Sequence, residues 1–485
     1  MPENKNWVIE LGGKAGWGGY CPAYGENDYP YIGNDNQFSY LVDADLTDPA
    51  VLTQGPKATN LTNGTEAGNV ATLISAILRT SISANLSFAC GVNKVYKITN
   101  TAVTAVATIT GGSHQVADSL IYYKSYIYVF WNDTGTEGEI AKVTPANMAI
   151  DVDWGSTTPT GNAHLEDAPH YSVLGGDDIA YFTNGKYIGS INGTTLTPEA
   201  LDFWTNSETA SIAWNHDMIE VAVNRPNVSG SNFNQSAVYR WNTVAPSWEG
   251  DPIEIPGETG ALYVKNGRTL IWYKDGIDDM GYVFGWLNGG VVSEIQRYKG
   301  SLPNQNQVGE IKGHIAWISS NKIMMFGSRD FGLGTKLFTY MSPVHAIAGA
   351  FASPFGTVLI SSENATTGKS LAKASGYSIA TAPKTKAYKV SGAGYKGQID
   401  LIQVETEEME TGAKLDTTIT YNQKKSTQTC TRIEYSVTKP TLHKIWSSSL
   451  EVEDFRLDLD FSKGSITKNV AIRSIEIKGH YVENL

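Results

Sequence analysis

Histidine, cysteine and acidic residues are the groups in this chain of 485 residues that could support catalysis or bind a metal ion. The eight histidines and three cysteines are scattered and match no zinc-binding spacing. His216 stands beside Asp217, but neighbouring residues of a strand point to opposite faces, so we interpret this pair as a solvated turn. Asp151 and Asp153 begin a calcium-loop pattern that lacks the remaining oxygen ligands. The sequence therefore predicts no metal site and no cofactor.

Signatures of common enzyme classes are also missing. The chain has no G-x-S-x-G nucleophile elbow, no P-loop, no dinucleotide fingerprint and no sialidase repeat of the form Ser-x-Asp-x-Gly-x-Thr-Trp. A glycosidase needs only two neighbouring carboxylates, and 49 acidic residues do not single out a pair. We therefore expect a protein that is not an enzyme, with a polysaccharide hydrolase as the third-ranked hypothesis.

The formal net charge of −12 argues against tight binding of nucleic acid, whose phosphates attract basic surfaces. The nearest approach to a basic cluster is the lysine pair in "NQKKSTQ" (422–428), which is typical of a solvated turn.

No stretch approaches the roughly 18 uncharged apolar residues of a membrane span, and the N-terminus shows no apolar signal core. Three widely spaced cysteines are typical of reduced thiols in a protein made in a cytosol.

Hairpin-like units recur along the middle of the chain. In each, a short apolar or aromatic strand precedes a polar turn and a second apolar strand. The clearest examples span residues 118–133, 177–193, 260–276 and 313–328. In the second unit, Asn184-Gly185 is a dipeptide that accepts the positive φ angles of a two-residue turn. Such strands and turns, in a chain with 48 glycines and 25 tyrosines, predict an all-β protein.

We expect a β-propeller over residues 68–396, because about four short strands recur there roughly every 35–50 residues. A four-stranded blade is covered only when other blades stack on it, so the chain repeats the unit until a ring closes. In "HIAWISS" (314–320), both alternating sets of side chains are largely apolar, as stacking requires. The repeats suggest about seven blades, with six or eight as alternatives. A β-sandwich with many hairpins is the alternative fold.

The two ends of the chain differ from this pattern. Residues 1–67 contain a stretch rich in Gly, Tyr and Asn without sustained alternation, which predicts an extended arm. Its aromatic side chains are interpreted as anchors on the body of this chain or of a neighbour. The candidate inter-subunit anchors are Trp17, Tyr20, Tyr24, Tyr29 and Tyr31. Residues 397–485 alternate apolar and charged side chains, as in "FRLDLDF" (455–461), and predict a β-sandwich-like region or a propeller cap.

Three features resemble the β-propeller tail proteins of tailed bacteriophages: the aromatic arm, the degenerate "GHIAWISSNKIMMFGS"-type units, and the closing "NVAIRSIEIKGHYVE". The chain looks most similar to the tail nozzle (packaged-DNA stabilisation) proteins of short-tailed phages. The resemblance lies in composition and in the pattern of strands over most of the chain, and not in a diagnostic motif. It implies a structural virion protein, made in the host cytoplasm, that forms a homo-oligomeric ring, usually a hexamer, around the DNA channel. Such a ring retains the genome until DNA ejection and contacts tail adaptor and fibre proteins.

A receptor-binding propeller that recognises host glycans is the main alternative, since exposed aromatic rings can stack on sugars. Its candidate residues are Trp241 and Trp248 in the Pro/Gly-containing connection "YRWNTVAPSWEG" (239–250). The opposing interpretation is that both indoles pack inside the fourth blade.

Overall fold

In the computed structural model, the described residues form β-strands joined by turns, with two short 3-10 helices, η1 (Gly13–Ala15) and η2 (Gln305–Gln307). The all-β prediction is confirmed. The structure describes residues 6–21, 29–48, 50–63, 74–78, 86–99, 102–110, 115–133, 137–155, 165–225, 235–275, 281–327, 337–341, 346–352, 358–364, 368–378, 380–438, 440–462, 464 and 467–483. None of these residues belongs to a helix long and apolar enough to cross a bilayer.

Five consecutive stretches of the chain each form a four-stranded antiparallel sheet in which sequence neighbours pair. The first two are β11 (Gln115–Tyr123), β12 (Tyr126–Asp133), β13 (Glu137–Val143), β14 (Ile150–Asp151) and β15 (Ser172–Leu174), β16 (Ala180–Asn184), β17 (Tyr187–Asn192), β18 (Thr195–Asp202). The next two are β19 (Glu208–Asn215), β20 (Met218–Arg225), β21 (Gln235–Trp241), β22 (Glu249–Ile255) and β23 (Gly257–Lys265), β24 (Arg268–Asp275), β25 (Tyr282–Asn288), β26 (Val291–Tyr298). The fifth is β27 (Val308–Ile311), β28 (His314–Ser319), β29 (Lys322–Phe326), β30 (Leu337–Met341).

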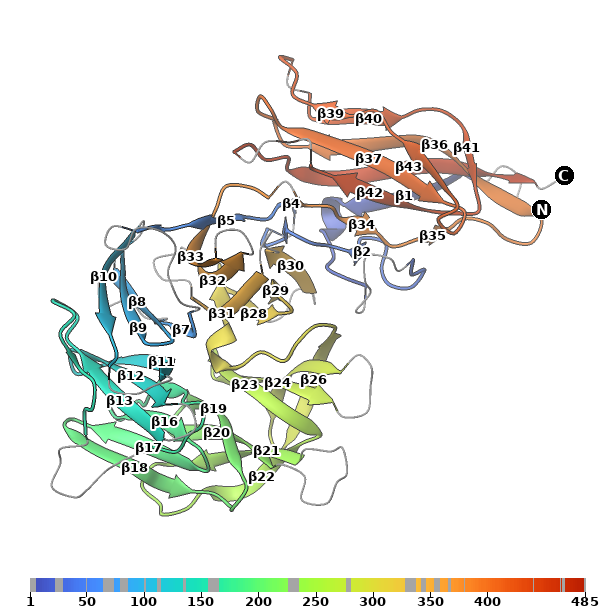
Figure 1. The fold of residues 1–485 in the computed structure, drawn as a ribbon. Coiled ribbons are helices and arrows are strands. Elements are labelled where there is room, and N and C mark those ends of the chain that lie inside the picture. The colour runs from blue at the N-terminus through green and yellow to red at the C-terminus, as the bar shows by residue number, and fades with distance from the viewer. Residues whose placement is uncertain are drawn as a thin grey trace.

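Two further sheets each take a strand from the N-terminal region. One contains β7 (Ala76–Ile77), β8 (Leu86–Gly91), β9 (Lys94–Thr99), β10 (Ala102–Thr108) and β6 (Thr62–Asn63). The other contains β31 (Ala346–Ala352), β32 (Leu359–Asn364), β33 (Gly368–Ser375) and β5 (Lys57–Asn60). Since β5 pairs with β33 and β6 pairs with β10, residues 57–63 link these two sheets. Figure 1 shows all these sheets around a common centre, the arrangement of a β-propeller.

Apolar side chains fill the space between neighbouring sheets of the ring. One cluster joins the sheet of β7–β10 to the sheet of β11–β14 through Phe88 and Trp131, and further clusters join the sheets that follow. A cluster with Tyr96 and Leu371 joins the sheet of β31–β33 to the sheet of β7–β10, so the ring is closed by packing as well as by strand pairing. Every residue of β28 is buried, as expected for a strand covered on both faces.

The hairpins recognised in the sequence occupy two different positions in their sheets. Those at 118–133 and 260–276 join first and second strands, whereas those at 177–193 and 313–328 join second and third strands. Successive turns of an antiparallel sheet lie at opposite ends of its strands. The two kinds of hairpin therefore lie on opposite faces of the ring.

The turn predicted at Asn184-Gly185 is displaced by one residue. Asn184 pairs with Tyr187 as the last residues of their strands, so the turn consists of Gly185 and Lys186. Gly185 has φ of 57°, which a residue with a side chain adopts at a cost. The glycine was correctly identified as the turn former, but Asn184 belongs to the strand.

The C-terminal region is built from two sheets, here called the paired sheets, which lie beside the ring (Figure 1). The first contains β1 (Asn6–Gly12), β43 (Ile472–Glu483), β36 (Tyr395–Thr406), β40 (Leu442–Trp446) and β41 (Leu450–Val452). The second contains β2 (Phe38–Tyr40), β34 (Lys384–Thr385), β35 (Tyr388–Lys389), β42 (Asp454–Asp460), β37 (Lys414–Tyr421), β38 (Ser426–Thr429) and β39 (Ile433–Glu434). Leu11 and Ile402 of the first sheet share one apolar core with Leu457 of the second.

Strand pairing divides the chain differently from the three consecutive segments 1–67, 68–396 and 397–485. The first segment is distributed: β1 and β2 join the paired sheets, β5 joins the propeller, and β3 (Ala44–Asp45) pairs with β4 (Thr53–Gln54). β34 and β35 also join the paired sheets although they precede residue 396. An extended segment satisfies its backbone hydrogen bonds most fully as a strand of an existing sheet, which accounts for the difference.

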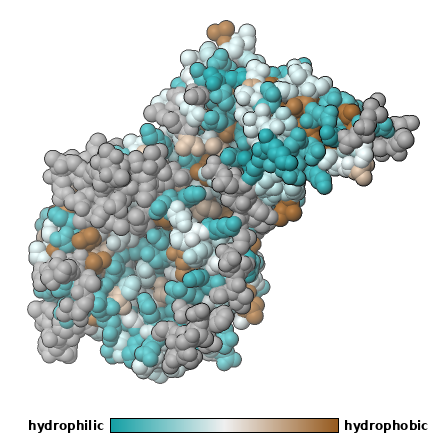
Figure 2. Space-filling view, turned by 45° about the vertical axis from the view of Figure 1, so that its right-hand side comes forward, coloured by the Kyte–Doolittle hydropathy of each residue, from teal (hydrophilic) through white to brown (hydrophobic). Residues whose placement is uncertain are grey.

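The surface is mixed in character. On the face shown in Figure 2, hydrophilic residues cover most of the described surface, and hydrophobic residues form small separate patches. Single exposed apolar residues of this kind are usual on a folded protein.

Candidate functional site

The aromatic arm residues are held by the paired sheets and the propeller of the same chain. Trp17 is completely buried: its Nε1 donates to the carbonyl oxygen of Ile472 at 3.0 Å, and its ring stacks on Phe38 with 5.7 Å between centroids. The backbone nitrogen of Tyr20 donates to the carbonyl oxygen of Leu337 in β30 at 2.7 Å. Trp17 thus fastens the arm to β43, and Tyr20 fastens it to the propeller.

Tyr29 and Tyr31 share one buried carboxylate at the start of β42. The Tyr29 hydroxyl donates to Oδ1 of Asp454 at 2.8 Å, and the Tyr31 hydroxyl donates to Oδ2 at 3.0 Å. Desolvation and the Asp454 carboxylate raise the pKa of Tyr31 to about 12, which keeps its hydroxyl protonated as a donor. The Arg456 guanidinium lies 5.5 Å from the ring centre of Tyr29. These contacts are called the Asp454 clamp below.

The predicted anchors therefore contact their own chain. Trp17 exposes no surface to a second subunit, because the ring is already buried by the paired sheets. Tyr31 is 43% exposed, and its role between subunits stays a prediction. Tyr24 lies outside the described residues.

The two tryptophans proposed for glycan stacking lie in different environments. Trp241 is buried, with its Nε1 donating to the carbonyl oxygen of Ala245 at 2.7 Å, so it packs inside its blade. Trp248 is half-buried and stacks on Phe203, with 5.6 Å between ring centroids and 14° between planes. The structure does not bring the two indoles onto one surface as a stacking pair.

Trp204 is an exposed aromatic residue that the sequence analysis missed. Its side chain is 41% exposed, lies 4.9 Å from the Trp248 ring, and is covered on one side by the Arg225 guanidinium, 3.6 Å from the ring centre. The signal in the sequence was "DFWTN" (202–206), where a tryptophan enters a polar connection between two hairpin units. Trp204, Trp248 and Arg225 form what is called the surface aromatic cluster.

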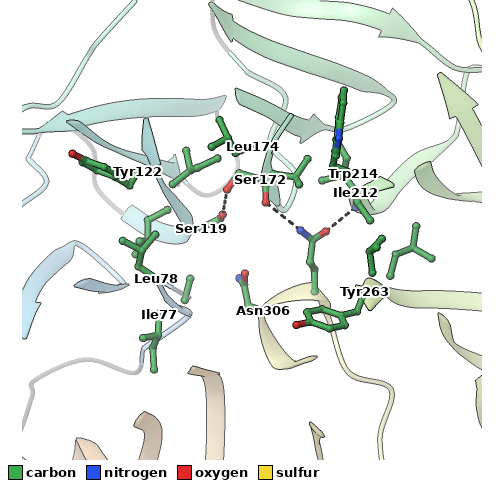
Figure 3. Close-up of a pocket in the computed structure, with 18 residues that line it drawn as sticks. Ile77, Leu78, Ser119, Tyr122, Ser172, Leu174, Ile212, Trp214, Tyr263 and Asn306 are labelled. Atoms are coloured by element: carbon green, nitrogen blue, oxygen red, sulfur yellow. Dashed lines mark hydrogen bonds between the residues drawn. The ribbon is translucent and has the colours of Figure 1, made fainter. Parts of the chain in front are cut away.

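A cavity of ≈ 320 Å³ lies at the centre of the ring, where the first strands of five sheets converge on η2 (Figure 3). Its lining comprises Ala76, Ile77, Leu78, Ser119, Leu120, Ile121, Tyr122, Ser172, Val173, Leu174, Ile212, Ala213, Trp214, Leu262, Tyr263, Val264, Gln305 and Asn306. No position in this set was singled out from the sequence, because the set is drawn from strands of separate repeats.

The helix η2 crosses the ring centre and is fixed by hydrogen bonds to three sheets. Gln305 accepts from the Ser211 hydroxyl at 2.8 Å and from the backbone nitrogen of Ile212 at 2.7 Å. Its Nε2 donates to the carbonyl oxygen of Ser172 at 3.3 Å. Asn306 Nδ2 donates to the carbonyl oxygen of Asp118 at 2.7 Å. The helix therefore closes one end of the cavity as a polar floor.

The described lining of the cavity is uncharged. It combines aliphatic side chains with Tyr122, Trp214 and Tyr263, and its polar side chains are hydroxyls and amides. Leu174 is 46% exposed, so solvent reaches the cavity beside it. Acid–base hydrolysis needs at least one carboxylate at the reacting bond, and the described lining supplies none. The arrangement is suited to binding a small molecule.

Two perturbed titratable groups lie where the sheet of β11–β14 meets the sheet of β15–β18. His170 is completely buried, and desolvation lowers its pKa to about 4; its Nδ1 donates to the carbonyl oxygen of Thr183 at 2.8 Å. Desolvation raises the pKa of Asp118 to about 7. The Asp118 carboxylate accepts a hydrogen bond from Asn132. Burial therefore favours the neutral form of both groups. Such shifts in pKa make the free energy of unfolding depend on pH.

The remaining chemical candidates form no centre. His216 and Asp217 are exposed in the turn between β19 and β20, which confirms their interpretation as a solvated turn. Among the described residues, no group of three or more His, Cys, Asp or Glu side chains could hold a metal ion, and Asp151 and Asp153 are both exposed. The three cysteines are free and buried.

No protein-family model matches the chain, and no curated protein matches it. Among solved structures, it is similar to the β-propeller domain of the Trilobed protease from Pyrococcus furiosus: 13% identity over 63% of this chain and 96% of that chain, TM-score 0.41. It is also similar to exo-β-1,3-galactanase from Phanerochaete chrysosporium: 9% identity, 87% and 99% coverage, TM-score 0.33. A third is Drosophila Plexin A in complex with Semaphorin 1b: 8% identity, 66% and 88% coverage, TM-score 0.38. Likenesses at this level identify no function.

Proposed function

We propose that the chain is a structural protein of a bacteriophage tail, a seven-bladed propeller with a fused C-terminal β-sandwich. Copies of it form a ring, most simply a hexamer, around the DNA channel. In the virion, this nozzle retains the packaged genome and contacts adaptor and fibre proteins. The observation that carries the proposal is the single apolar core that joins the paired sheets to the propeller.

This core contains residues of both parts. Phe338 and Met325 of the propeller belong to the same buried cluster as Ile402 and Leu457 of the paired sheets. Tyr20 adds a polar bridge, since its hydroxyl donates to the carbonyl oxygen of Leu41 at 2.6 Å and its backbone bonds to β30. Large apolar interfaces hold domains in one orientation. A rigid two-part subunit is suited to a ring whose channel must keep its diameter under pressure from packaged DNA.

The closed centre of the propeller constrains where such a channel would run. Because η2 occupies the ring centre through Gln305 and Asn306, the proposal places DNA between subunits and not through one propeller. The net charge of −12 supports a channel wall that DNA does not adhere to.

The mass of the purified protein by light scattering across a concentration series tests this proposal, together with mass spectrometry of virions that carry the gene. A discrete ring of about six copies, and several copies in each virion, is the expected result. A compact trimer favours the receptor-binding alternative. A protein that is monomeric in solution and missing from virions contradicts the proposal.

Deletion of residues 1–40 does not test the role of the arm between subunits by itself. The deletion removes β1, Trp17 and all of β2, which belong to the paired sheets, while β5 of the propeller is retained. We expect the propeller to fold and the paired sheets to lose stability. Loss of the ring would then report damage to the subunit as well as loss of an inter-subunit arm.

Glycan recognition is the second candidate function, supported by the exposure of Trp204 beside Trp248. Binding on a glycan array that is lost in both Trp204→Ala and Trp248→Ala would favour it. Trp241→Ala is not a useful variant, because this buried indole stabilises the blade.

A further inference from the structure

We propose that the cavity at the ring centre binds the terminal unit of a neutral saccharide. The inference is independent of the ring proposal and of the surface aromatic cluster. It rests on the charge, shape and polar groups of the cavity. With a volume of ≈ 320 Å³, the cavity lies near the lower end of the range typical of small-molecule sites, about 300–1,000 Å³.

The charge of the described lining selects the ligand class. None of the 18 described lining residues is Asp, Glu, Lys, Arg or His. A charged group in this cavity would lose hydration without gaining an opposite charge, which costs free energy. The cavity therefore favours a neutral molecule over a sugar acid or a phosphate.

The aromatic residues provide flat apolar surfaces for the C–H faces of a sugar ring. Trp214 is held in place by Tyr181, with 6.3 Å between ring centroids and 15° between planes. Gly176 lies so close that a Cβ there would be 2.9 Å from the Trp214 indole nitrogen. Tyr122 and Tyr263 line other parts of the same cavity (Figure 3). Because the indole is held before binding, little side-chain entropy is lost when a ligand stacks on it.

The polar groups of the floor provide partners for sugar hydroxyls. Asn306 projects toward the cavity, and the hydrogen bond from its Nδ2 to the Asp118 carbonyl oxygen fixes the amide plane. Among the described residues, Asn306 Oδ1 has no hydrogen-bond partner and can accept from a hydroxyl. The hydroxyls of Ser119 and Ser172 bond to each other at 2.9 Å, leaving further acceptor capacity.

The shape of the cavity limits which part of a glycan it can hold. At one end, η2 closes the cavity; at the other, the side chain of Leu174 is 46% exposed. A pocket with one open end admits the end of a chain and excludes its interior. The ligand is therefore the terminal unit of a glycan or a free mono- or disaccharide.

Saturation-transfer NMR with the purified full chain tests the proposal. The neutral probes are glucose, galactose, N-acetylglucosamine and maltose, and the charged probes are glucuronic acid and N-acetylneuraminic acid. We expect saturable binding of at least one neutral probe and none of the charged probes. No saturable binding of any neutral probe up to about 10 mM, where millimolar Kd values are measurable, overturns the proposal.

Variants then locate the site. Leu174→Trp narrows the open end at an exposed position, and Trp214→Ala removes the stacking surface; both are expected to weaken binding about tenfold or more. Trp204→Ala is the matched control, because this indole belongs to the surface aromatic cluster and not to the cavity. Thermal unfolding verifies that each variant is folded. Unchanged binding in folded Leu174→Trp, or binding lost only in Trp204→Ala, overturns the cavity as the site.

Discussion

The propeller and the paired sheets both consist mainly of antiparallel strands, but they differ in how far apart in sequence the paired strands lie. In the propeller, most strands that pair are neighbours in sequence, as when Tyr123 pairs with Tyr126 across a tight turn; β5 and β6, which pair with β33 and β10, are exceptions. In the paired sheets, Asn6 pairs with His480, so the two ends of the chain must meet before the sheet is complete. The strand pairing of the propeller is therefore specified mainly within each repeat. The strand pairing of the paired sheets requires contacts between segments from both ends of the sequence.

The consequence for folding follows from the entropy of loop closure. Local hairpins close short loops, whereas pairing of β1 with β43 closes nearly the full length of the chain. We infer that the arm docks after most other strands have formed. Contacts such as Trp17 and the Asp454 clamp then hold a segment that has no core of its own.

The largest expected effect is at Trp17. Replacement of this buried indole by alanine should lower the free energy of unfolding by about 3–5 kcal/mol and release the arm from β43. Denaturant unfolding and limited proteolysis of the arm measure the two effects. Trp317→Ala is the matched control: its indole is equally buried, but in the propeller, so stability should fall while the arm stays protected. Equal protection of the arm in both variants would contradict the long-range role of Trp17.

The next effect is a pH dependence located in the propeller. The neutral form of His170 is favoured in the folded state, with its pKa lowered to about 4 from 6.5. As pH falls from 6.5 to 4, the unfolded chain takes up this proton first, so the contribution of His170 to stability falls by about 3 kcal/mol. Asp118 opposes this effect: with its pKa raised to about 7, its folded state takes up a proton first and gains stability as pH falls.

Urea unfolding across this pH range separates the two groups. In Asp118→Asn, the gain in stability from protonation of Asp118 is absent, so the loss caused by His170 is no longer opposed. The free energy of unfolding should therefore fall more steeply as the pH is lowered. His170→Asn should remove that loss. If both variants follow the wild-type pH curve, the two groups do not titrate as described.

A smaller effect is expected at the ring centre. Gln305→Ala removes the acceptor of the Ser211 hydroxyl and of the Ile212 backbone nitrogen, which should cost about 1–3 kcal/mol. Gln428→Ala, at an exposed position of β38, is the control and should change stability little. Because η2 bonds to separate sheets, this is the one tested contact in the propeller that depends on distant segments. A Gln305 variant as stable as the control would mean that neighbouring repeats alone hold the ring together.

The smallest expected effect concerns one local turn. Gly185→Ala places a side chain at φ of 57°, with its Cβ 2.9 Å from the Cβ of Glu166, and should cost about 1 kcal/mol. Gly290→Ala is the matched control, since nothing lies within 4 Å of an added Cβ there. Thermal unfolding compares the two variants. Equal stability would show that the turn adapts without strain.

Much of the propeller could be predicted from the sequence, because its signals are local. Hairpins such as 118–133 combine apolar strands with polar turns, and buried strands such as β28 are apolar on both sets of alternating positions. The candidate glycan-stacking residues were predicted less well than the strands. Trp241 and Trp248 were chosen as aromatic residues in a connection, but only neighbouring strands decide which ring is buried, and Trp204 proved to be the exposed one.

The sequence by itself determined that this protein is all-β, where hairpins such as 118–133 and 313–328 form, and that a repeated unit dominates the middle of the chain. These properties depend on side-chain alternation and turn chemistry within a few residues. Tertiary structure alone decided that the arm supplies β1 and β2 to the paired sheets and that Trp17 is buried there. It also decided that η2 closes the ring centre and leaves an uncharged cavity above it. The physical reason is that hydrogen bonds and burial between distant segments depend on which surfaces come into contact. A local sequence pattern carries no information about those contacts.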